Sequence, residues 1–123
     1  MNHLIEMGSS MGGNGLKILK GTLEILILKT LHQGPNHGYG IVRWLKEISS
    51  EEFQVEEGAL YPALRKLEKR GLVASGWEVT NTGREAKFYN LTPAGREALE
   101  EATANWDRYV SAMDSVMRPA GDR

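Results

Sequence analysis

The 123-residue sequence contains no cysteine, no long hydrophobic run and no excess of charge of one sign. Without cysteine the chain can form neither a disulfide framework nor a thiolate metal site, which suits a reducing compartment. The apolar run Ile25–Leu28 is far shorter than the roughly 20 residues that span a bilayer. The N-terminus lacks the basic start and apolar stretch of a signal peptide. We therefore expect a cytoplasmic protein that does not associate with membranes.

The near balance of charge is uneven along the chain. The formal net charge of -1 argues, over the whole sequence, against a nucleic-acid binder. However, residues 58–92 carry six Lys and Arg against three Asp and Glu, whereas residues 1–57 carry five against seven and residues 93–123 four against six. Because phosphate attraction is screened within about 8–10 Å, the basic middle segment matters more than the sum.

Groups suited to catalysis are scarce as well. His32 and His37 lie near a predicted helix junction without a neighbouring acid, and no cysteine is available as a nucleophile. An enzyme would need a nucleophile with a base, a carboxylate pair or a set of metal ligands. The sequence therefore predicts no enzymatic activity, no cofactor and no metal site.

Apolar periodicity and capping residues predict two helices in the first half of the chain. Residues 1–15 are rich in glycine and serine and predict a flexible N-terminal lead, and a short helix is expected over residues 16–20. Thr22 is the expected N-cap of a helix that ends at Gly34–Pro35. The next helix starts from a cap at Asn36 or His37 and stops at Ser49–Ser50, and residues 53–55 predict a brief edge strand.

A third helix is predicted from Gly58 to Gly71, and it is the expected DNA-reading segment. Apolar residues at spacings of four, three and four place one face on the core: Leu60, Leu64, Leu67 and Gly71. The opposite face combines low bulk at its start with cations, and comprises Gly58, Pro62, Arg65 and Lys69, flanked by Tyr61 and Lys66. The alternative is an ordinary solvated face whose cations pair in part with Glu68.

After Gly71 the pattern becomes that of a β-hairpin. Extended segments flank a turn at residues 81–83, where Asn and Gly tolerate positive φ. Thr82, Arg84 and Lys87 could contact DNA phosphates, although two cations on a hairpin also discourage edge pairing. Thr92 as N-cap and Pro93 at the first helical position then begin a final helix.

Three helices followed by a hairpin predict a winged helix-turn-helix, a mainly α fold with a small β-hairpin, over residues 16–92. Residues 93–123 would form a long C-terminal dimerisation helix and tail. This layout, together with the basic helix face and the basic hairpin, predicts specific binding to double-stranded DNA. A winged helix that binds protein instead of DNA is the alternative, for which the basic face would be unnecessary.

Five segments of the chain form recognisable motifs, namely Gly21–Leu28, His37–Ile41, Gly58–Leu64, Leu67–Val73 and Tyr89–Gly95. Together they resemble the PadR family of bacterial transcriptional regulators, over about Lys20 to Trp106. The resemblance implies a homodimeric repressor that binds an inverted-repeat operator, often that of its own gene or of a neighbouring efflux or detoxification gene. It also implies that Tyr39 contacts DNA, together with Tyr61 and the basic residues. Two departures, Gly40 for an acidic residue and Ala59 for a small hydroxyl residue, affect the operator sequence.

The final helix carries an apolar stripe with the spacing of a coiled-coil seam. A lone helix cannot bury such a stripe, so it packs either on its own domain or, as we expect, against a second copy of the chain. Part of the same stripe could alternatively line a pocket for a planar, drug-like inducer, formed by Trp106, Tyr109 and Met113. The full stripe is Leu99, Ala102, Trp106, Tyr109, Met113 and Val116.

Overall fold

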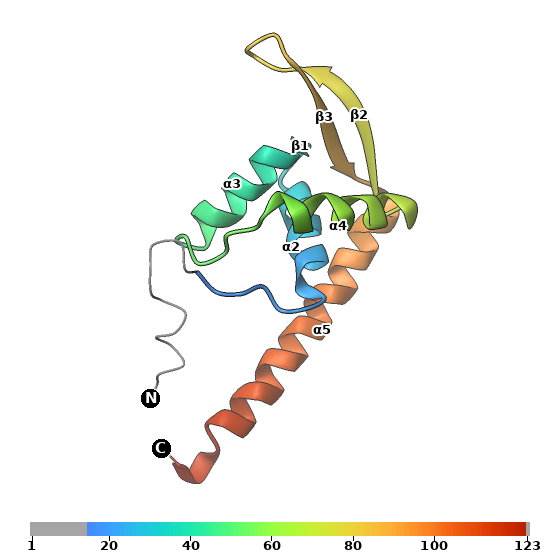
Figure 1. Cartoon of the computed structure of the whole chain (residues 1–123). Helices are drawn as coiled ribbons and strands as arrows, with labels where there is room; N and C mark the ends of the chain where they lie inside the picture. The colour runs from blue at the N-terminus through green and yellow to red at the C-terminus, as the bar shows by residue number, and fades with distance from the viewer. Residues whose placement is uncertain (1–14, 123) are drawn as a thin grey trace.

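The computed structural model describes residues 15–122, so the predicted flexible lead lies outside the described residues except for Gly15. Figure 1 shows a helical body with a two-stranded hairpin projecting at one end and a long C-terminal helix at the other. No helix in residues 15–122 combines the length and hydropathy of a membrane span. The elements are α2 (Thr22–His32), β1 (Asn36–His37), α3 (Gly38–Ile48), α4 (Glu57–Lys69), β2 (Val73–Val79), β3 (Glu85–Leu91), α5 (Pro93–Met117) and the 3-10 turn η1 (Ala120–Asp122).

Two predicted helix caps are confirmed. The Nδ1 atom of His37 accepts a hydrogen bond from the backbone N–H of Gly40 at 3.0 Å, which starts α3. The hydroxyl of Thr92 accepts one from the N–H of Gly95 at 3.0 Å, and Pro93 follows at the start of α5. Each side chain satisfies a donor that the first helical turn leaves unpaired, so both helix starts are fixed locally.

Two expectations at the N-terminal side are wrong. Residues 16–20 form no helix; instead Leu16 pairs with Phe53 in a single parallel bridge, which gives the predicted extended link at residues 53–55 its partner. Thr22 is not the N-cap of α2, because Gly21 takes that position with a φ of 87°. Glycine adopts this left-handed conformation at low cost, so it makes the turn into the helix, and the hydroxyl of Thr22 donates to the carbonyl of Leu19 instead.

The boundaries of α4 differ slightly from the prediction. The helix begins at Glu57 with Glu56 as N-cap, so Gly58 lies inside the first turn and does not open it. It ends at Lys69, and Gly71 lies beyond the end at a φ of 77°, exposed and outside the core. The N–H of Gly71 donates to the carbonyl of Glu68, and that of Leu72 to Leu67. This glycine-terminated pairing ends the helix and directs the chain into β2.

The predicted hairpin is present, and a third strand extends it. β2 and β3 pair antiparallel from Val73 opposite Leu91 to Val79 opposite Glu85. The turn closes where the N–H of Thr80 donates to the carbonyl of Arg84, with Gly83 at a φ of 83°. β1 joins the other edge of β3, so the strand order is β1-β3-β2. A two-residue strand has no periodicity, and the sequence pattern therefore gave no sign of it.

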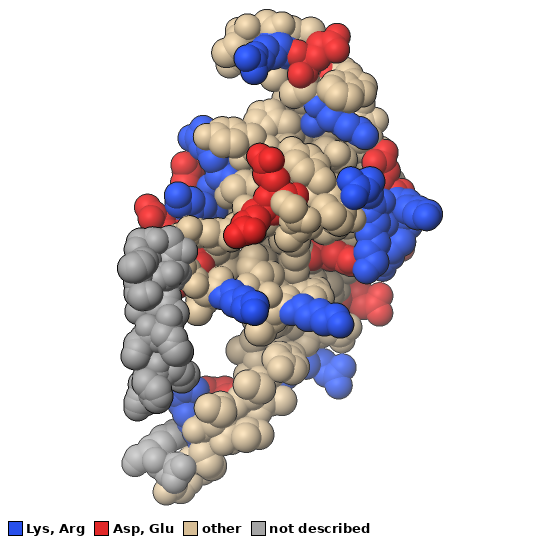
Figure 2. All heavy atoms as spheres, in the orientation of Figure 1, with Lys and Arg blue, Asp and Glu red and all other residues tan. Residues whose placement is uncertain are grey.

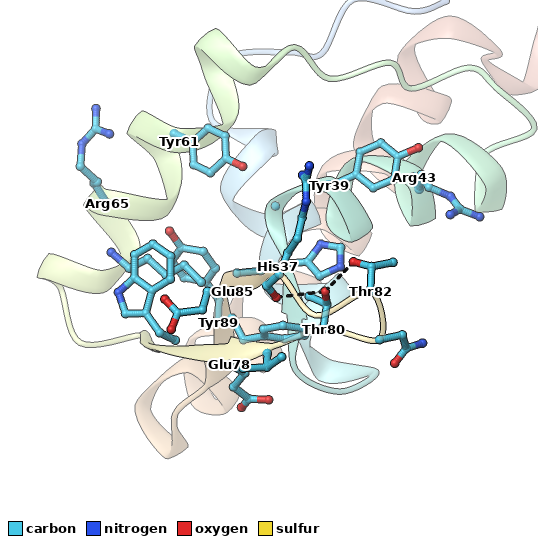
Figure 3. A pocket seen from close by; sticks show the side chains of 18 residues that line it. His37, Tyr39, Arg43, Tyr61, Arg65, Glu78, Thr80, Thr82, Glu85 and Tyr89 are labelled. Carbon is cyan, nitrogen blue, oxygen red and sulfur yellow. Dashed lines mark hydrogen bonds between the residues drawn. The ribbon is translucent and has the colours of Figure 1, made fainter.

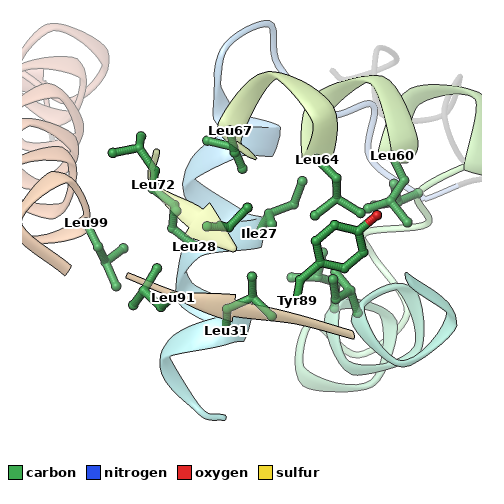
Figure 4. Packing of buried hydrophobic residues seen from close by; sticks show 14 residues of the cluster. Ile27, Leu28, Leu31, Leu60, Leu64, Leu67, Leu72, Tyr89, Leu91 and Leu99 are labelled. Carbon is green, nitrogen blue, oxygen red and sulfur yellow. The ribbon is translucent and has the colours of Figure 1, made fainter. Parts of the chain in front are cut away.

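A single hydrophobic core lies between α2, α4 and the base of the hairpin (Figure 4). The leucine stripe of α4 is fully buried, which confirms the predicted core face at Leu60, Leu64 and Leu67. Leu99 of α5 also belongs to this core and is only 5% exposed. Its assignment to a dimer seam is therefore wrong, because a side chain already buried in its own chain has little area left for a partner.

The close contact between α5 and the loop after α4 predicts a cost for any side chain at Gly95. A Cβ added there would overlap the backbone carbonyl oxygen of Leu72, which cannot rotate away. We expect Gly95→Ala to lower the free energy of unfolding by about 1–3 kcal/mol, measured by urea denaturation. Gly58→Ala is the control, since nothing lies within 4 Å of its added Cβ. Equal stability of Gly95→Ala and the unaltered protein would contradict this packing.

Candidate nucleic-acid interface

A groove of about 1270 Å³ lies between the hairpin, the start of α3 and the middle of α4. In Figure 3, Tyr39 and Arg43 from α3 and Tyr61 and Arg65 from α4 lie across from Glu78, Thr80 and Thr82 of the hairpin. The groove thus brings together segments that are more than 40 residues apart in sequence. Its walls carry six aromatic rings, those of His37, Tyr39, Tyr61, Trp77, Phe88 and Tyr89.

The charges that line this groove are mostly positive. Four cations, Arg43, Arg65, Arg84 and Lys87, are accompanied by only two carboxylates, Glu78 and Glu85. Figure 2 shows further Lys and Arg atoms gathered where α4 ends, although acidic atoms lie in the middle of the same face. The overall negative charge of the chain therefore does not describe this surface, which attracts a polyanion at short range.

Tyr61 occupies the junction between α3 and α4 because its neighbour lacks a side chain. A Cβ added at Gly38 would overlap the hydroxyl end of the Tyr61 ring, so a side chain at this position would displace the ring from where it lies. The ring remains 37% exposed and lines the groove. Tyr61 is therefore both a packing residue and a surface residue, and its position depends on Gly38.

The hairpin is joined to α4 by a buried phenol and a hydrogen bond. Tyr89 is buried, and burial raises the pKa of its phenol; Glu68 and Tyr61 add to this effect and Arg65 opposes it. The hydroxyl of Ser75 donates to the Glu68 carboxylate at 2.6 Å. These contacts fix the hairpin relative to α4, so the two walls of the groove keep their separation.

The cations of α4 divide into two groups. Arg65 lines the groove, and Lys69 lies on the adjoining exposed face with Pro62. Lys66 instead lies 3.6 Å from Glu24 of α2, which also accepts a bond from Arg70 at 3.0 Å. The expected partial pairing of these cations with Glu68 is absent, since Glu68 forms no ion pair within residues 15–122 and its carboxylate accepts from Ser75. The Lys66 side chain therefore points partly toward its own domain, so it is less available than Arg65 or Lys69 to contact a ligand.

The other predicted contact residues lie either on the outer face of α4 or along the groove. Gly58 and Pro62 are exposed on the outer face of α4, as the helical spacing predicted. Tyr39, Tyr61, Thr82, Arg84 and Lys87 all line the groove.

Arg43 and Trp77 are among the groove residues that were missed in the sequence. The guanidinium carbon of Arg43 lies 5.8 Å from the centre of the Tyr39 ring, and its Nη2 atom lies 3.5 Å from a carboxylate oxygen of Glu47. The four-residue spacing of Tyr39 and Arg43 on one predicted helix was the signal that could have found it. Trp77 is 66% exposed on β2 and also lines the groove.

The second half of α5 leaves the body of the protein. Every side chain from residue 103 to 121 is exposed, while Ala102 is half-buried. The rings of Trp106 and Tyr109 stack at a centroid distance of 5.9 Å. A hollow of about 730 Å³ on this helix includes Tyr109 but neither Trp106 nor Met113. The exposed apolar side chains of this α5 face are Trp106, Tyr109, Val110, Met113, Val116 and Met117.

The three helices, the hairpin and the basic groove between them define a winged-helix transcriptional regulator. Residues 27–101, more than half of the chain, match the Transcriptional regulator PadR-like family. The chain belongs to this family, so it is a regulator of transcription and not an enzyme.

Three similar proteins illustrate the relationship. A transcriptional regulator of Mycobacterium tuberculosis is 42% identical over 71 residues, which cover 57% of this chain and 64% of the relative. The negative transcriptional regulator PadR of Bacillus subtilis is 30% identical over 79 residues, covering 64% of this chain and 43% of the relative. Both matches cover less than two thirds of this chain and less than two thirds of the relative. The crystal structure of a PadR family transcriptional regulator from Eggerthella lenta has a TM-score of 0.70, 31% identity, and coverage of 81% of this chain and 85% of that one.

The contact between Gly38 and Tyr61 predicts that two substitutions depend on each other. Gly38→Ala should lower the free energy of unfolding by about 0.5–1 kcal/mol, because the new methyl group overlaps the hydroxyl end of the Tyr61 ring and the partly exposed ring has to turn away. Truncating the ring removes the overlap, so adding Gly38→Ala to Tyr61→Ala should cost much less. Urea denaturation of the four proteins measures this coupling. Additive effects of the two substitutions would contradict the contact.

Proposed function

We propose that this protein is a homodimeric repressor that binds an inverted-repeat operator in double-stranded DNA through α4 and the hairpin. The observation that carries the proposal is the basic groove, in which Arg65 of α4, Arg43 of α3 and Arg84 of the hairpin line one concave surface. The name of the Bacillus subtilis relative, a negative regulator, supports repression. A winged helix used only to bind protein would have no need for this concentration of cations.

The residues of the interface have different expected roles. α4 enters the major groove, where the low bulk of Gly58 and Ala59 permits a close approach and Arg65 can bond guanine with its two-pronged guanidinium. Tyr39, Tyr61, Pro62, the cations of α4 other than Arg65 and the cations of the hairpin contact the backbone or the groove edges. Contacts of this second kind position the protein without reading sequence. The division of labour therefore separates base reading by α4 from phosphate contact by the hairpin.

The α5 face supports the dimer. Its apolar side chains recur along about three turns of a helix that extends away from the body, where no other part of residues 15–122 covers them. Burial of such a stripe against a second copy is the usual solution. Residues 16–92 would then act as the DNA-binding domain and residues 93–123 as the dimerisation element, and a two-fold axis would place two α4 helices on the two halves of a palindrome.

A small-molecule effector is a narrower proposal that rests on the stacked pair of Trp106 and Tyr109. A planar ligand held between these rings and their symmetry mates, with Met113 beside them, would alter the angle between the protomers. Such a ligand would favour the DNA-free arrangement only if it binds that arrangement more tightly.

Substitution of one arginine in each wall should separate base reading from phosphate contact. We expect Arg65→Ala to weaken binding to a selected operator by about 10–100-fold and to affect random duplex DNA much less. Arg84→Ala should weaken binding to all sequences by a similar factor and lower the salt dependence by about one counterion. Fluorescence anisotropy over a salt series measures both. Equal losses on operator and random DNA for Arg65→Ala would refute its role in reading bases.

A charge placed on the α5 face should separate the protomers. We expect Met113→Glu to convert the dimer to monomer in sedimentation experiments, because two carboxylates would face each other in an apolar seam. Operator affinity should fall with it, since each monomer reads only half of the site. Arg108→Glu adds a carboxylate to the same helix outside the apolar stripe and is the matched control. A Met113→Glu protein that remains dimeric would contradict the proposed seam.

A further inference from the structure

Trp77 is an exposed aromatic residue whose side chain has no function in the fold. It is 66% exposed on β2, the outer strand of the hairpin. Its indole N–H makes no hydrogen bond to any residue in the described part of the chain. What distinguishes this ring from other exposed apolar side chains, such as Ile48, is that it lines the basic groove, where it is placed to contact a ligand.

The direction of the Trp77 side chain follows from the strand register. Side chains alternate along β2, so Trp77 shares a face with Ser75, whose hydroxyl bonds Glu68 of α4. Trp77 is directly opposite Lys87 on β3, and Lys87 itself lies 5.9 Å from the centre of the buried Tyr89 ring. The indole and the ammonium group therefore stand side by side on the face of the hairpin that looks toward α4, on the wall of the basic groove.

The chemistry of this pair defines its occupant. The indole offers an apolar surface and a single donor with no acceptor, and Lys87 offers a positive charge. The complementary ligand is a chain of apolar units joined by anionic acceptors. The sugar–phosphate backbone has this composition, since its deoxyribose rings alternate with phosphate oxygens. The four cations of the groove also favour a polyanion over an apolar protein segment or a second copy of this chain.

We propose that Trp77 binds the DNA backbone directly, with its ring against deoxyribose and its indole N–H donated to a phosphate oxygen beside Lys87. This inference rests on the proposed function and adds to it a contact that is neither ionic nor sequence-specific. The hairpin then holds DNA along its inner face as well as at its turn. Trp77 strengthens binding to every sequence, because both of its partners are the same in every nucleotide.

The experiment compares Trp77→Ala, Trp77→Phe and Lys87→Ala on random-sequence duplex DNA over a salt series, using the full chain. Trp77→Ala should weaken binding about tenfold at every salt concentration, and Trp77→Phe about threefold, because phenylalanine keeps a ring but loses the donor. Neither should change the slope of log affinity against log salt, since the indole carries no charge. Lys87→Ala should instead reduce that slope by about one.

Two controls separate a DNA contact from a structural role. Ile48→Ala removes an equally exposed apolar side chain, 64% exposed at the end of α3 and outside the groove, and should bind DNA as the unaltered protein does. The emission of Trp77 is obtained as the difference between the spectrum of the unaltered protein and that of Trp77→Phe. This emission should move to shorter wavelength when duplex DNA is added, because the ring leaves water.

The outcomes distinguish this inference from the proposed function. Salt-dependent DNA binding by the unaltered protein, together with unchanged affinity of Trp77→Ala, would overturn the inference and leave the function standing. A lower oligomeric state of Trp77→Ala without loss of DNA affinity would overturn it in favour of a second copy as the occupant. If the unaltered protein shows no salt-dependent binding to DNA, the proposed function fails and this inference fails with it.

Discussion

The arrangement of the whole groove depends on the burial of one narrow leucine stripe on α4. Leu60, Leu64 and Leu67 are fully buried against α2 and the base of the hairpin. Each such side chain contributes about 1.5–3 kcal/mol relative to an exposed one, so the rotation of α4 about its axis is strongly determined. A helix with one face fixed has its opposite face fixed too. The hydrophobic core therefore decides that Arg65 and Tyr61 face the groove and that Gly58 and Pro62 face outward.

The second wall of the groove is set by shorter-range contacts. Tyr89 and the bond between Ser75 and Glu68 attach the hairpin to α4, and Gly38 allows α3 to approach Tyr61. α5 continues this rigidity outward, since its start is capped at Thr92 and its first turns pack on the core through Leu99. A 25-residue helix is about 37 Å long, so a contact near its far end can set the position of a whole domain. This geometry would couple a dimer seam to the spacing of two reading helices.

Periodic features could be predicted from the sequence, and tertiary pairings could not. The α4 stripe, the hairpin and the caps at His37 and Thr92 each depend on residues close together in the chain, and the structure has them. Lys66 and Glu24 are far apart in sequence, so their ion pair was invisible. β1 is too short to carry a pattern. Leu99 fits the spacing of the α5 stripe, but spacing cannot tell whether a partner chain or the chain's own core covers a residue.

The residues of the candidate groove could likewise be predicted only in part from the sequence. Arg65, Arg84 and Lys87 stood out because they are cations on predicted outward faces. Arg43 and Trp77 belong to the groove because the fold brings the hairpin beside α3 and α4, which no local sequence pattern specifies. Helical and strand spacing therefore predict the cations at the centre of the site, whereas the residues around them are known only from the tertiary fold.

Selection of bound duplexes from a random pool tests the central claim most directly. If two copies of the chain present two α4 helices about a two-fold axis, the recovered sequences should share an inverted repeat whose half-sites lie about one helical turn apart, or a multiple of it. A pool with no enriched sequence would contradict specific DNA binding. An enriched site without two-fold symmetry would contradict the dimer that the α5 face supports.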